Sequence, residues 1–176
     1  MFIFKLFYKY LTTFGSYLLL MGRSIAVPEG TTERTEVPAT YVPARNLIFL
    51  SYALGYAERV GALHLYIGVN SVDYSGYPDC RPAFIKAFQA AADAATAVSA
   101  EHGQRIVVET PLQYLSKGEI IRRGTQLGVP YEMTTSCYRG EALACGTCDS
   151  CLLRLRGFAE AGRCDPISYL PHGEEV

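Results

Sequence analysis

Two neighbouring stretches in the middle of the chain show the apolar spacing of a helix and then of a strand. Over residues 47–60, apolar side chains recur every three or four positions, and Gly61 ends the pattern. Residues 63–69 (LHLYIGV) alternate instead, with leucine, isoleucine and valine on one side. We therefore predict a helix over 47–60 and a strand over 63–69, and residues 70–81 are typical of a turn-rich loop.

The same order of patterns returns further along the chain. Residues 84–98 carry the apolar stripe of a second helix, and RIVVETPL (105–112) is a second short strand. Ser116 and Glu119 have the spacing of a capping box, so a third helix begins there and ends before Gly128.

These elements together predict the fold class. Helix, strand, loop, helix, strand and helix in this order are typical of a parallel α/β sheet with crossover helices. In such sheets, ligands bind beyond the carboxyl ends of the strands. Because the loop over 70–81 lies at such an end, we expect it to be part of the functional site.

The first residues of the chain need a separate interpretation. Residues 2–21 are apolar enough to suggest a signal or membrane segment, but Lys5 and Lys9 interrupt the run. A secretory signal would place its charge before the apolar core and end in small residues, and this stretch does neither. We favour a buried or partner-facing segment, with a membrane-related role as the alternative, and expect a cytoplasmic protein without a membrane partner.

The composition is that of an ordinary globular protein. The 176 residues are 49% hydrophobic and 19% charged, and the net charge is −1. With no basic excess to neutralise phosphates, we do not expect a nucleic-acid partner. Any anionic ligand must be met by a few well-placed groups.

Four cysteines lie within SCYRGEALACGTCDSC (136–151), in the spacing C-x7-C-x2-C-x2-C. Four thiolates can close a tetrahedral shell around zinc, and a closed shell leaves no position for substrate, so the site would be structural. An iron–sulfur cluster is an alternative, although the Cys-Pro of the ferredoxin run is missing. Disulfides or free thiols are another, although nothing here indicates secretion. The predicted zinc ligands are Cys137, Cys145, Cys148 and Cys151.

Polar and aromatic side chains gather in the loop GVNSVDYSGYPDCRPAF (68–84). Carboxylates at the carboxyl end of a strand can hold Mg²⁺ against nucleotide phosphates, and tyrosines can stack on a flat heterocycle. A structural interpretation is equally open, because Asp79 is in position to cap the helix that starts near Pro82. Cys80 and Cys164 stand apart from the cysteine cluster, and a small buried hydrophobe is the simplest interpretation of each.

Two basic residues outside this loop are candidates for anion binding. Arg45 lies just ahead of the first predicted helix and could fork to a phosphate or carboxylate, or lie on the surface. Lys117 is in the first turn of the third helix, where a cation is unfavourable without an anionic partner.

Several of these stretches resemble one enzyme family. TYVPARN (40–46), GVNSVDYSGYPDCR (68–81), ETPL with KGEI (109–112, 117–120) and SCYRG with CGTCDSC (136–140, 145–151) occur in the same order in 7-cyano-7-deazaguanine synthases. The resemblance runs from about residue 15 to residue 169. It implies a Rossmann-like ATP-pyrophosphatase fold, similar to the adenine nucleotide alpha hydrolases, with a zinc-binding C-terminal segment. The domains would be 1–130 for the partial Rossmann-like part and 131–170 for the zinc-binding part.

The resemblance also implies a reaction. Such enzymes convert 7-carboxy-7-deazaguanine, ATP and ammonia to the nitrile 7-cyano-7-deazaguanine, a precursor of queuosine. ATP, with Mg²⁺, activates the carboxylate as an acyl adenylate, and ammonia displaces AMP to give an amide. A second ATP activates the amide oxygen, whose loss leaves the nitrile. The chain would thus be an ATP-dependent carbon–nitrogen ligase with a structural zinc ion, and the resemblance suggests dimers.

Site residues follow from the resemblance position by position. The four clustered cysteines resemble the zinc ligands. Asp73 resembles the acidic residue near Mg²⁺ and phosphate, and with Asp79 and Cys80 it makes up the expected catalytic group. The expected substrate- and nucleotide-binding residues are Arg45, Asn46, Gly68, Asn70, Ser75, Gly76, Tyr77 and Lys117.

One motif of the family does not occur here. Family members open with a strand and a glycine-rich SGGxDS loop whose backbone amides hold the ATP phosphates. No SGGxDS is present in this sequence. We therefore expect an N-terminally truncated fold without its first strand and nucleotide loop, and a chain that is inactive alone. The alternative is a non-catalytic, zinc-stabilised binding module or a remnant of a split or mis-called gene.

Overall fold

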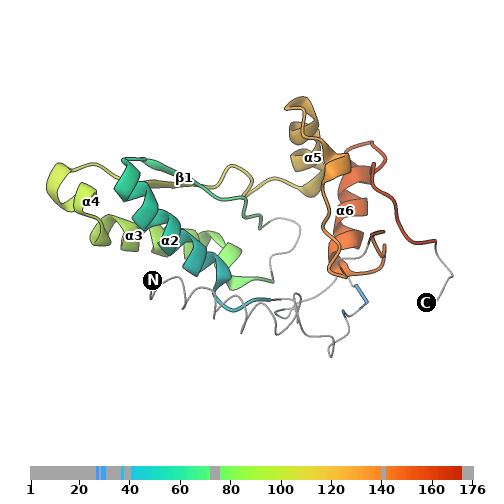
Figure 1. The fold of residues 1–176 in the computed structure, drawn as a ribbon, viewed down its shortest axis with the longest axis horizontal. Coiled ribbons are helices and arrows are strands. Elements are labelled where there is room, and N and C mark those ends of the chain that lie inside the picture. Colours follow the sequence, from blue (N-terminus) through green and yellow to red (C-terminus); the bar gives the residue numbers. More distant parts are fainter. Residues whose placement is uncertain are drawn as a thin grey trace. The chain divides into compact units, whose positions relative to one another are not determined.

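The computed structural model describes most of the chain after residue 40 and four residues before it (Figure 1). The described residues are 27, 29–30, 37, 41–71, 76–139 and 142–171. The apolar segment at 2–21 lies outside the described residues. Contacts within the chain define two compact units. We call Pro43–Leu115 the sheet unit, and Ser116–Val176 with Met1–Val42 the cysteine unit. The predicted domains 1–130 and 131–170 stay a prediction.

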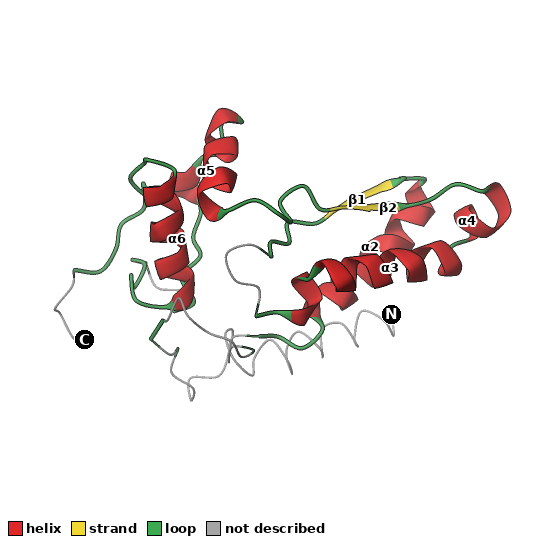
Figure 2. Cartoon of the chain, turned by 180° about the vertical axis from the view of Figure 1, so that it is seen from behind, coloured by secondary structure: helices red, strands yellow, loops and turns green. Residues whose placement is uncertain are grey.

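The sheet unit contains a parallel pair of strands packed against helices. Its elements are α2 (Arg45–Val60), β1 (His64–Tyr66), the 3-10 turn η1 (Pro78–Cys80), α3 (Pro82–Ala95), α4 (Ala97–His102) and β2 (Val107–Glu109). The two strands pair in parallel, with Leu65 opposite Val108. Figure 2 shows α2 and α3 along one side of these strands. The expected α/β class with a parallel sheet is confirmed at this level, although the sheet has only two strands among the described residues.

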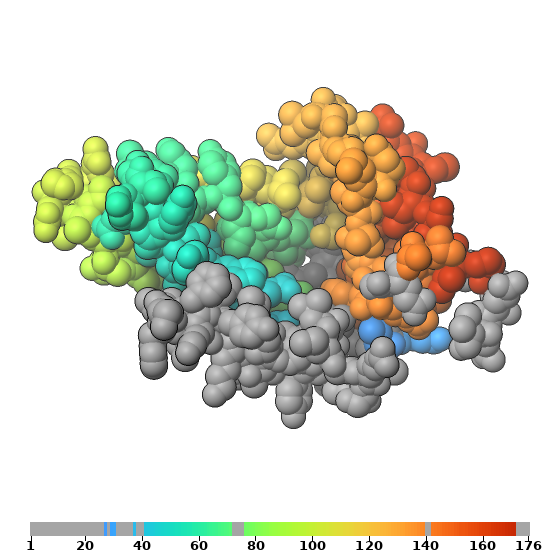
Figure 3. Space-filling view, in the orientation of Figure 1, coloured from blue at the N-terminus to red at the C-terminus, as the bar shows by residue number. Residues whose placement is uncertain are grey.

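Apolar side chains from both helices and both strands form the core of the sheet unit. Its buried members are Leu50, Phe88, Ala92 and Val108, and Leu54, Ile67, Phe84 and Ile85 pack against them. The outer side of α2 carries large exposed residues, including Tyr52 and Tyr56. Part of this helix, coloured cyan to green, is visible at the surface in Figure 3. The helical spacing over 47–60 identified the middle of the buried face, where Leu50 and Ala57 are buried, but Leu47 and Val60 at its ends are exposed.

Two predicted elements of the sheet unit differ from the structure. The strand expected over 63–69 is limited to His64–Tyr66, although Ile67 still donates its N–H to the Glu109 carbonyl. The helix expected over 84–98 breaks at Thr96, which is extended (φ −102°, ψ 139°) and buried. The Thr96 hydroxyl donates to the Ala92 carbonyl, so a local hydrogen bond competes with continuation of the helix. α3 and α4 are consequently separate helices.

The cysteine unit is built on two packed helices. They are α5 (Lys117–Gln126) and α6 (Asp149–Glu160), with a short turn η2 (Tyr131–Met133) between them. The capping box at the start of α5 is confirmed, because the Ser116 side chain accepts from the Glu119 amide and the Glu119 carboxylate accepts from the Ser116 amide. Where α6 crosses α5, Gly157 lies so close that a Cβ would be 2.7 Å from the Lys117 Cβ.

The described residues include no helix with the length and apolar character needed to cross a membrane.

Candidate functional site

The four clustered cysteines converge in the cysteine unit. Cys137 follows η2, Cys145 and Cys148 lie in the segment that leads into α6, and Cys151 is in the first turn of that helix. Their Sγ atoms all lie within 4.8 Å of one another. Cys148 has an exposed fraction of 0%, so the cluster is closed to solvent on at least that side. The predicted grouping of these four side chains is confirmed.

The donor set fits a tetrahedral metal ion. A Zn–S bond of about 2.3 Å gives a tetrahedron whose sulfurs are about 3.8 Å apart. The Sγ atoms of Cys145 and Cys151 are 3.9 Å apart, close to that edge. Because all four positions of such a shell would be filled by protein sulfur, the arrangement suits a structural ion rather than one that binds substrate.

Backbone amides point at the sulfurs. Gly146 adopts a left-handed conformation (φ 72°), which turns the chain so that the amides of Thr147 and Cys148 both donate to Cys145 Sγ, over 3.4 and 3.3 Å. The Cys145 amide donates to Cys137 Sγ over 3.4 Å. Such N–H···S contacts disperse the negative charge that four thiolates concentrate.

The same contacts affect thiol acidity. Burial alone would raise the pKa of Cys145, but the donors at Cys148 and Thr147 outweigh it and lower that pKa to about 6. Burial and the neighbouring Cys148 and Cys137 instead raise the pKa of Cys151. These N–H donors therefore favour the thiolate form of Cys145, which is the form that a metal ion requires.

Part of the second candidate site lies outside the described residues. Asp73 and Ser75 fall within 72–75, so the proposed Mg²⁺-facing carboxylate is not placed. Of the remaining loop residues, Gly76 is buried and Tyr77 is half-buried. Gly68 lies just beyond β1, where a Cβ in place of its hydrogen would have Leu112 Cδ1 as its nearest neighbour, at 3.8 Å.

Asn70 ties the loop after β1 to the turn after β2. Its side-chain amide donates to the carbonyls of Leu112, over 3.1 Å, and Leu115, over 2.5 Å. Ser71 donates to the Gln113 carbonyl through both its amide and its hydroxyl. The segments beyond the carboxyl ends of the two parallel strands are thus joined, as expected for the binding edge of such a sheet.

Asp79, Cys80 and Asn46 form a compact polar contact. Asp79 is only 6% exposed, and its Oδ2 accepts from the main-chain amide of Asn46 over 2.8 Å. The Asn46 side chain donates to the Asp79 carbonyl and to Cys80 Sγ, over 3.1 and 3.2 Å. The structure therefore brings Asn46, Asp79 and Cys80 together, beside Arg45, the first residue of α2.

Two structural interpretations from the sequence are wrong. Asp79 does not cap α3, since Arg81 is the N-cap of that helix and Pro82 its first residue. The carboxylate instead satisfies an amide in the first turn of α2, because η1 directs it away from the helix that follows. Cys164 is exposed rather than buried, because it lies in an irregular segment after α6.

Lys117 is the first residue of α5, in the cysteine unit.

Gln113 is a buried polar residue that the sequence did not single out. It is 2% exposed, its Nε2 donates to the Cys80 carbonyl over 3.0 Å, and its Oε1 has no hydrogen-bond partner among the described residues. It also lines a pocket of about 220 Å³ with Lys86, Thr110, Tyr114 and other residues of α3 and β2. The sequence did contain a signal for Gln113, because it lies four residues beyond the carboxyl end of β2. Ligands of parallel sheets bind beyond such strand ends.

Fold and site together define an α/β protein with a four-thiolate centre, and comparison with known proteins gives its family. The family model described as "Queuosine biosynthesis protein QueC" matches residues 4–162. A protein of Desulfitobacterium hafniense named 7-cyano-7-deazaguanine synthase is 57% identical over 155 residues, which cover 88% of this chain and 66% of the relative. Proteins of the same name from Geobacter metallireducens and Methylococcus capsulatus are each 58% identical, over 82% of this chain and 62% and 65% of their own lengths. The chain belongs to the QueC family.

The match covers only part of each relative's sequence. The chain spans about two thirds of the length of the curated relatives that it matches.

Proposed function

We propose that this chain carries part of a 7-cyano-7-deazaguanine synthase, an ATP-dependent ligase that converts a carboxylate to a nitrile. The observation that supports this most is the 57% identity over 88% of the chain to a protein of that name. The four-cysteine cluster supports it independently, because the family resemblance required those residues to meet and they do. A Rossmann-like arrangement of the complete sheet is part of the proposal.

The proposed reaction proceeds in two activations. The substrate carboxylate attacks the α-phosphorus of ATP, giving an acyl adenylate and pyrophosphate, and ammonia then displaces AMP and loses a proton to give the amide. The amide oxygen attacks a second ATP, again releasing pyrophosphate. Departure of that oxygen with AMP, and loss of the remaining protons from nitrogen, gives the nitrile. Each step develops negative charge on a departing phosphate, which the protein must stabilise.

The described residues suggest how the sheet unit contributes. Asn70 and Ser71 hydrogen-bond the segment after β1 to the turn over 110–115. The groups that contact substrate would therefore lie on a part of the sheet edge that these bonds hold in place. In the proposal, Asp73 faces Mg²⁺ and the phosphates when ATP binds, and Ser75, Gly76 and Tyr77 line the pocket. Arg45, Asn46, Asp79 and Cys80 form its second side. Lys117, in the cysteine unit, stays a separate prediction of an anion-binding residue.

Zinc is proposed as the occupant of the cysteine cluster. Cys137, Cys145, Cys148 and Cys151 would hold it, and a closed shell of four thiolates supplies folding energy rather than reactivity. We assign it no part in the chemical steps.

We further propose that the 176-residue chain does not turn over ATP alone, because SGGxDS does not occur within it. The test compares the chain with a fusion that adds the part of the Desulfitobacterium hafniense relative that the match does not cover. Both receive ATP, Mg²⁺, 7-carboxy-7-deazaguanine and ammonium, and AMP and nitrile are measured by liquid chromatography with mass spectrometry. The fusion should form two AMP per nitrile, and the chain alone should form neither.

Controls separate the synthase from a binding module. An Asp73→Asn fusion should lose turnover but still retain its zinc. A fusion that forms neither AMP nor nitrile, yet binds the deazapurine in calorimetry, would contradict the synthase and favour the non-catalytic module. Turnover by the chain alone would contradict only the requirement for the added segment.

A further inference from the structure

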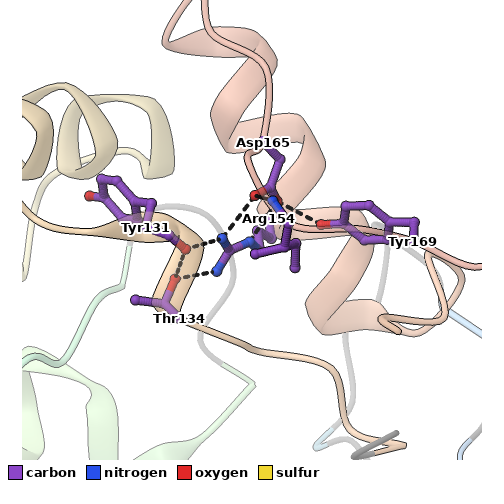
Figure 4. Close-up of polar contacts among 6 residues, drawn as sticks. Tyr131, Thr134, Arg154, Asp165 and Tyr169 are labelled. Atoms are coloured by element: carbon purple, nitrogen blue, oxygen red, sulfur yellow. Dashed lines mark hydrogen bonds and ion pairs between the residues drawn. The ribbon is translucent and has the colours of Figure 1, made fainter. Parts of the chain in front are cut away.

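A buried ion pair lies beside the cysteine cluster. Arg154 on α6 donates from Nε and Nη2 to the two carboxylate oxygens of Asp165, over 2.6 and 2.8 Å (Figure 4). The two side chains are 10% and 2% exposed. This forked geometry fixes the planar guanidinium more firmly than a single contact would, and lysine cannot reproduce it.

The same guanidinium reaches the segment that precedes Cys137. Arg154 donates from Nη1 to Thr134 Oγ1 over 2.8 Å and from Nη2 to the Tyr131 carbonyl over 3.2 Å. Figure 4 shows these contacts converging from separate parts of the chain. Arg154 lies one helical turn after Cys151, so it connects the helix that carries one ligand to the turn that leads to another.

Asp165 in turn contacts Tyr169, which packs against the buried core around the cysteines. The Tyr169 hydroxyl donates to Asp165 Oδ2 over 2.6 Å, and Tyr169 packs against the buried group formed by Ala144, Cys145, Cys148 and Cys151. The main chain on either side of Tyr169 pairs with Ala144: the Ala144 amide donates to the Ser168 carbonyl, and the Leu170 amide to the Ala144 carbonyl. Ala144 immediately precedes Cys145.

We propose that Arg154, Asp165 and Tyr169 are positioning residues for the metal centre, and that they hold the segment 165–170 against the thiolates as a cover that slows metal loss. The inference rests on the proposed zinc site and adds residues that neither the cysteine spacing nor the family motifs assign. The three segments that supply the four sulfurs are thereby fixed to one guanidinium. Outer contacts of this kind change metal affinity in proteins by about 10–100-fold.

A purely structural role would give a different result. In that case, breaking the network would lower the unfolding free energy of the cysteine unit without changing the rate at which folded protein loses metal. The two roles are separated by measuring zinc release directly, beside denaturant unfolding of the same variants. Cobalt(II), substituted for zinc, adds a spectroscopic readout, because its visible absorption reports the geometry of the four sulfurs.

The experiment uses the full chain loaded with zinc and an excess of a chromophoric chelator. Asp165→Asn and Arg154→Lys should release zinc about 10-fold faster or more than the wild type. Tyr169→Phe keeps the ring and removes only the hydroxyl donor, so its release should be faster than the wild type but slower than Asp165→Asn. The matched control is Arg122→Met, which removes the more exposed Arg122–Glu160 pair of the same unit and should leave release unchanged.

The outcomes decide between the claims. Release rates of Asp165→Asn, Arg154→Lys and Tyr169→Phe within twofold of the wild type, with unchanged cobalt spectra, would overturn the positioning role even if stability falls. If the larger changes prevent folding, Tyr169→Phe alone carries the test. Wild-type protein that retains no zinc would overturn the zinc site itself, and the positioning role with it.

Discussion

The carboxylate of Asp79 accepts a hydrogen bond from the main-chain amide of Asn46, 33 residues earlier, over 2.8 Å. The loop after β1 therefore provides the cap that the first turn of α2 lacks, because the N-cap residue Ala44 has no side-chain acceptor. The side-chain amide of Asn46 donates to Cys80 Sγ over 3.2 Å. Any change at Asp79 thus affects both the helix and the candidate site.

We expect Asp79→Ala to destabilise the protein by about 1–2 kcal/mol, the usual cost of losing a cap and leaving a part-buried amide without a partner. Urea unfolding measures the change. Glu101→Ala removes an exposed carboxylate from α4 of the same unit and should change stability by less than about 0.5 kcal/mol. An Asp79→Ala variant as stable as Glu101→Ala would contradict the capping role.

Close packing of α6 on α5 depends on a glycine. In Gly157→Ala the new Cβ would lie 2.7 Å from the Lys117 Cβ and 3.0 Å from Ile121 Cδ1, so the helices must shift. We expect a loss of about 1–3 kcal/mol, as for other overpacked sites. The matched control is Gly55→Ala in α2, where nothing lies within 4 Å and alanine should stabilise the helix by roughly 0.5–1 kcal/mol. Equal effects at the two positions in thermal unfolding would refute this packing.

The ion pair between Arg154 and Asp165 makes the free energy of unfolding depend on pH. Burial opposes ionisation of Asp165, but hydrogen bonds from Arg154 and Tyr169 and the amide of Ile167 outweigh it and lower its pKa below the usual 3.8. A lowered pKa contributes stability that is present above the unfolded-state value and is lost as pH falls through the folded-state value. The stability difference between wild type and Asp165→Asn, about 3–5 kcal/mol for a broken buried pair, should stay constant from about pH 8 to pH 5 and shrink below about pH 4.

Denaturant unfolding of both proteins, with zinc in saturating excess at every pH, measures that difference apart from metal loss. A gap that closes between pH 8 and pH 5 would mean that Asp165 is not held ionised by Arg154.

The features that the sequence predicted correctly are those encoded locally. The four thiolates come from one short segment with a turn-forming Gly146 between two of them, so their spacing alone brought them together. The capping box of Ser116 and Glu119 and the left-handed Gly61 that ends α2 are likewise set by a few neighbouring residues. Periodicity found α2 and α3 because each buries one side against the core of the sheet unit.

The features that were missed depend on contacts between distant residues. Thr96 fits the apolar periodicity around it, and nothing in its spacing predicts the extended conformation that ends α3. Asp79 has the sequence position of a cap for α3, but the chain turns at η1 and delivers it to α2. Arg154 and Asp165 pair across an irregular segment, and no spacing rule predicts such a pair. α6 was not predicted because its N-cap Cys148 and the first-turn residue Cys151 belong to the cysteine motif, which obscured the apolar face of the helix.

The central claim is that Cys137, Cys145, Cys148 and Cys151 bind one tetrahedral metal ion. Metal analysis and native mass spectrometry of the reduced chain, purified without added metal, test it directly, with Cys148→Ser as the comparison. We predict one zinc ion for each wild-type chain and a large loss of it in Cys148→Ser, because a buried ligand position is removed. Reduced wild-type protein that contains iron and sulfide, or no metal at all, would contradict the claim.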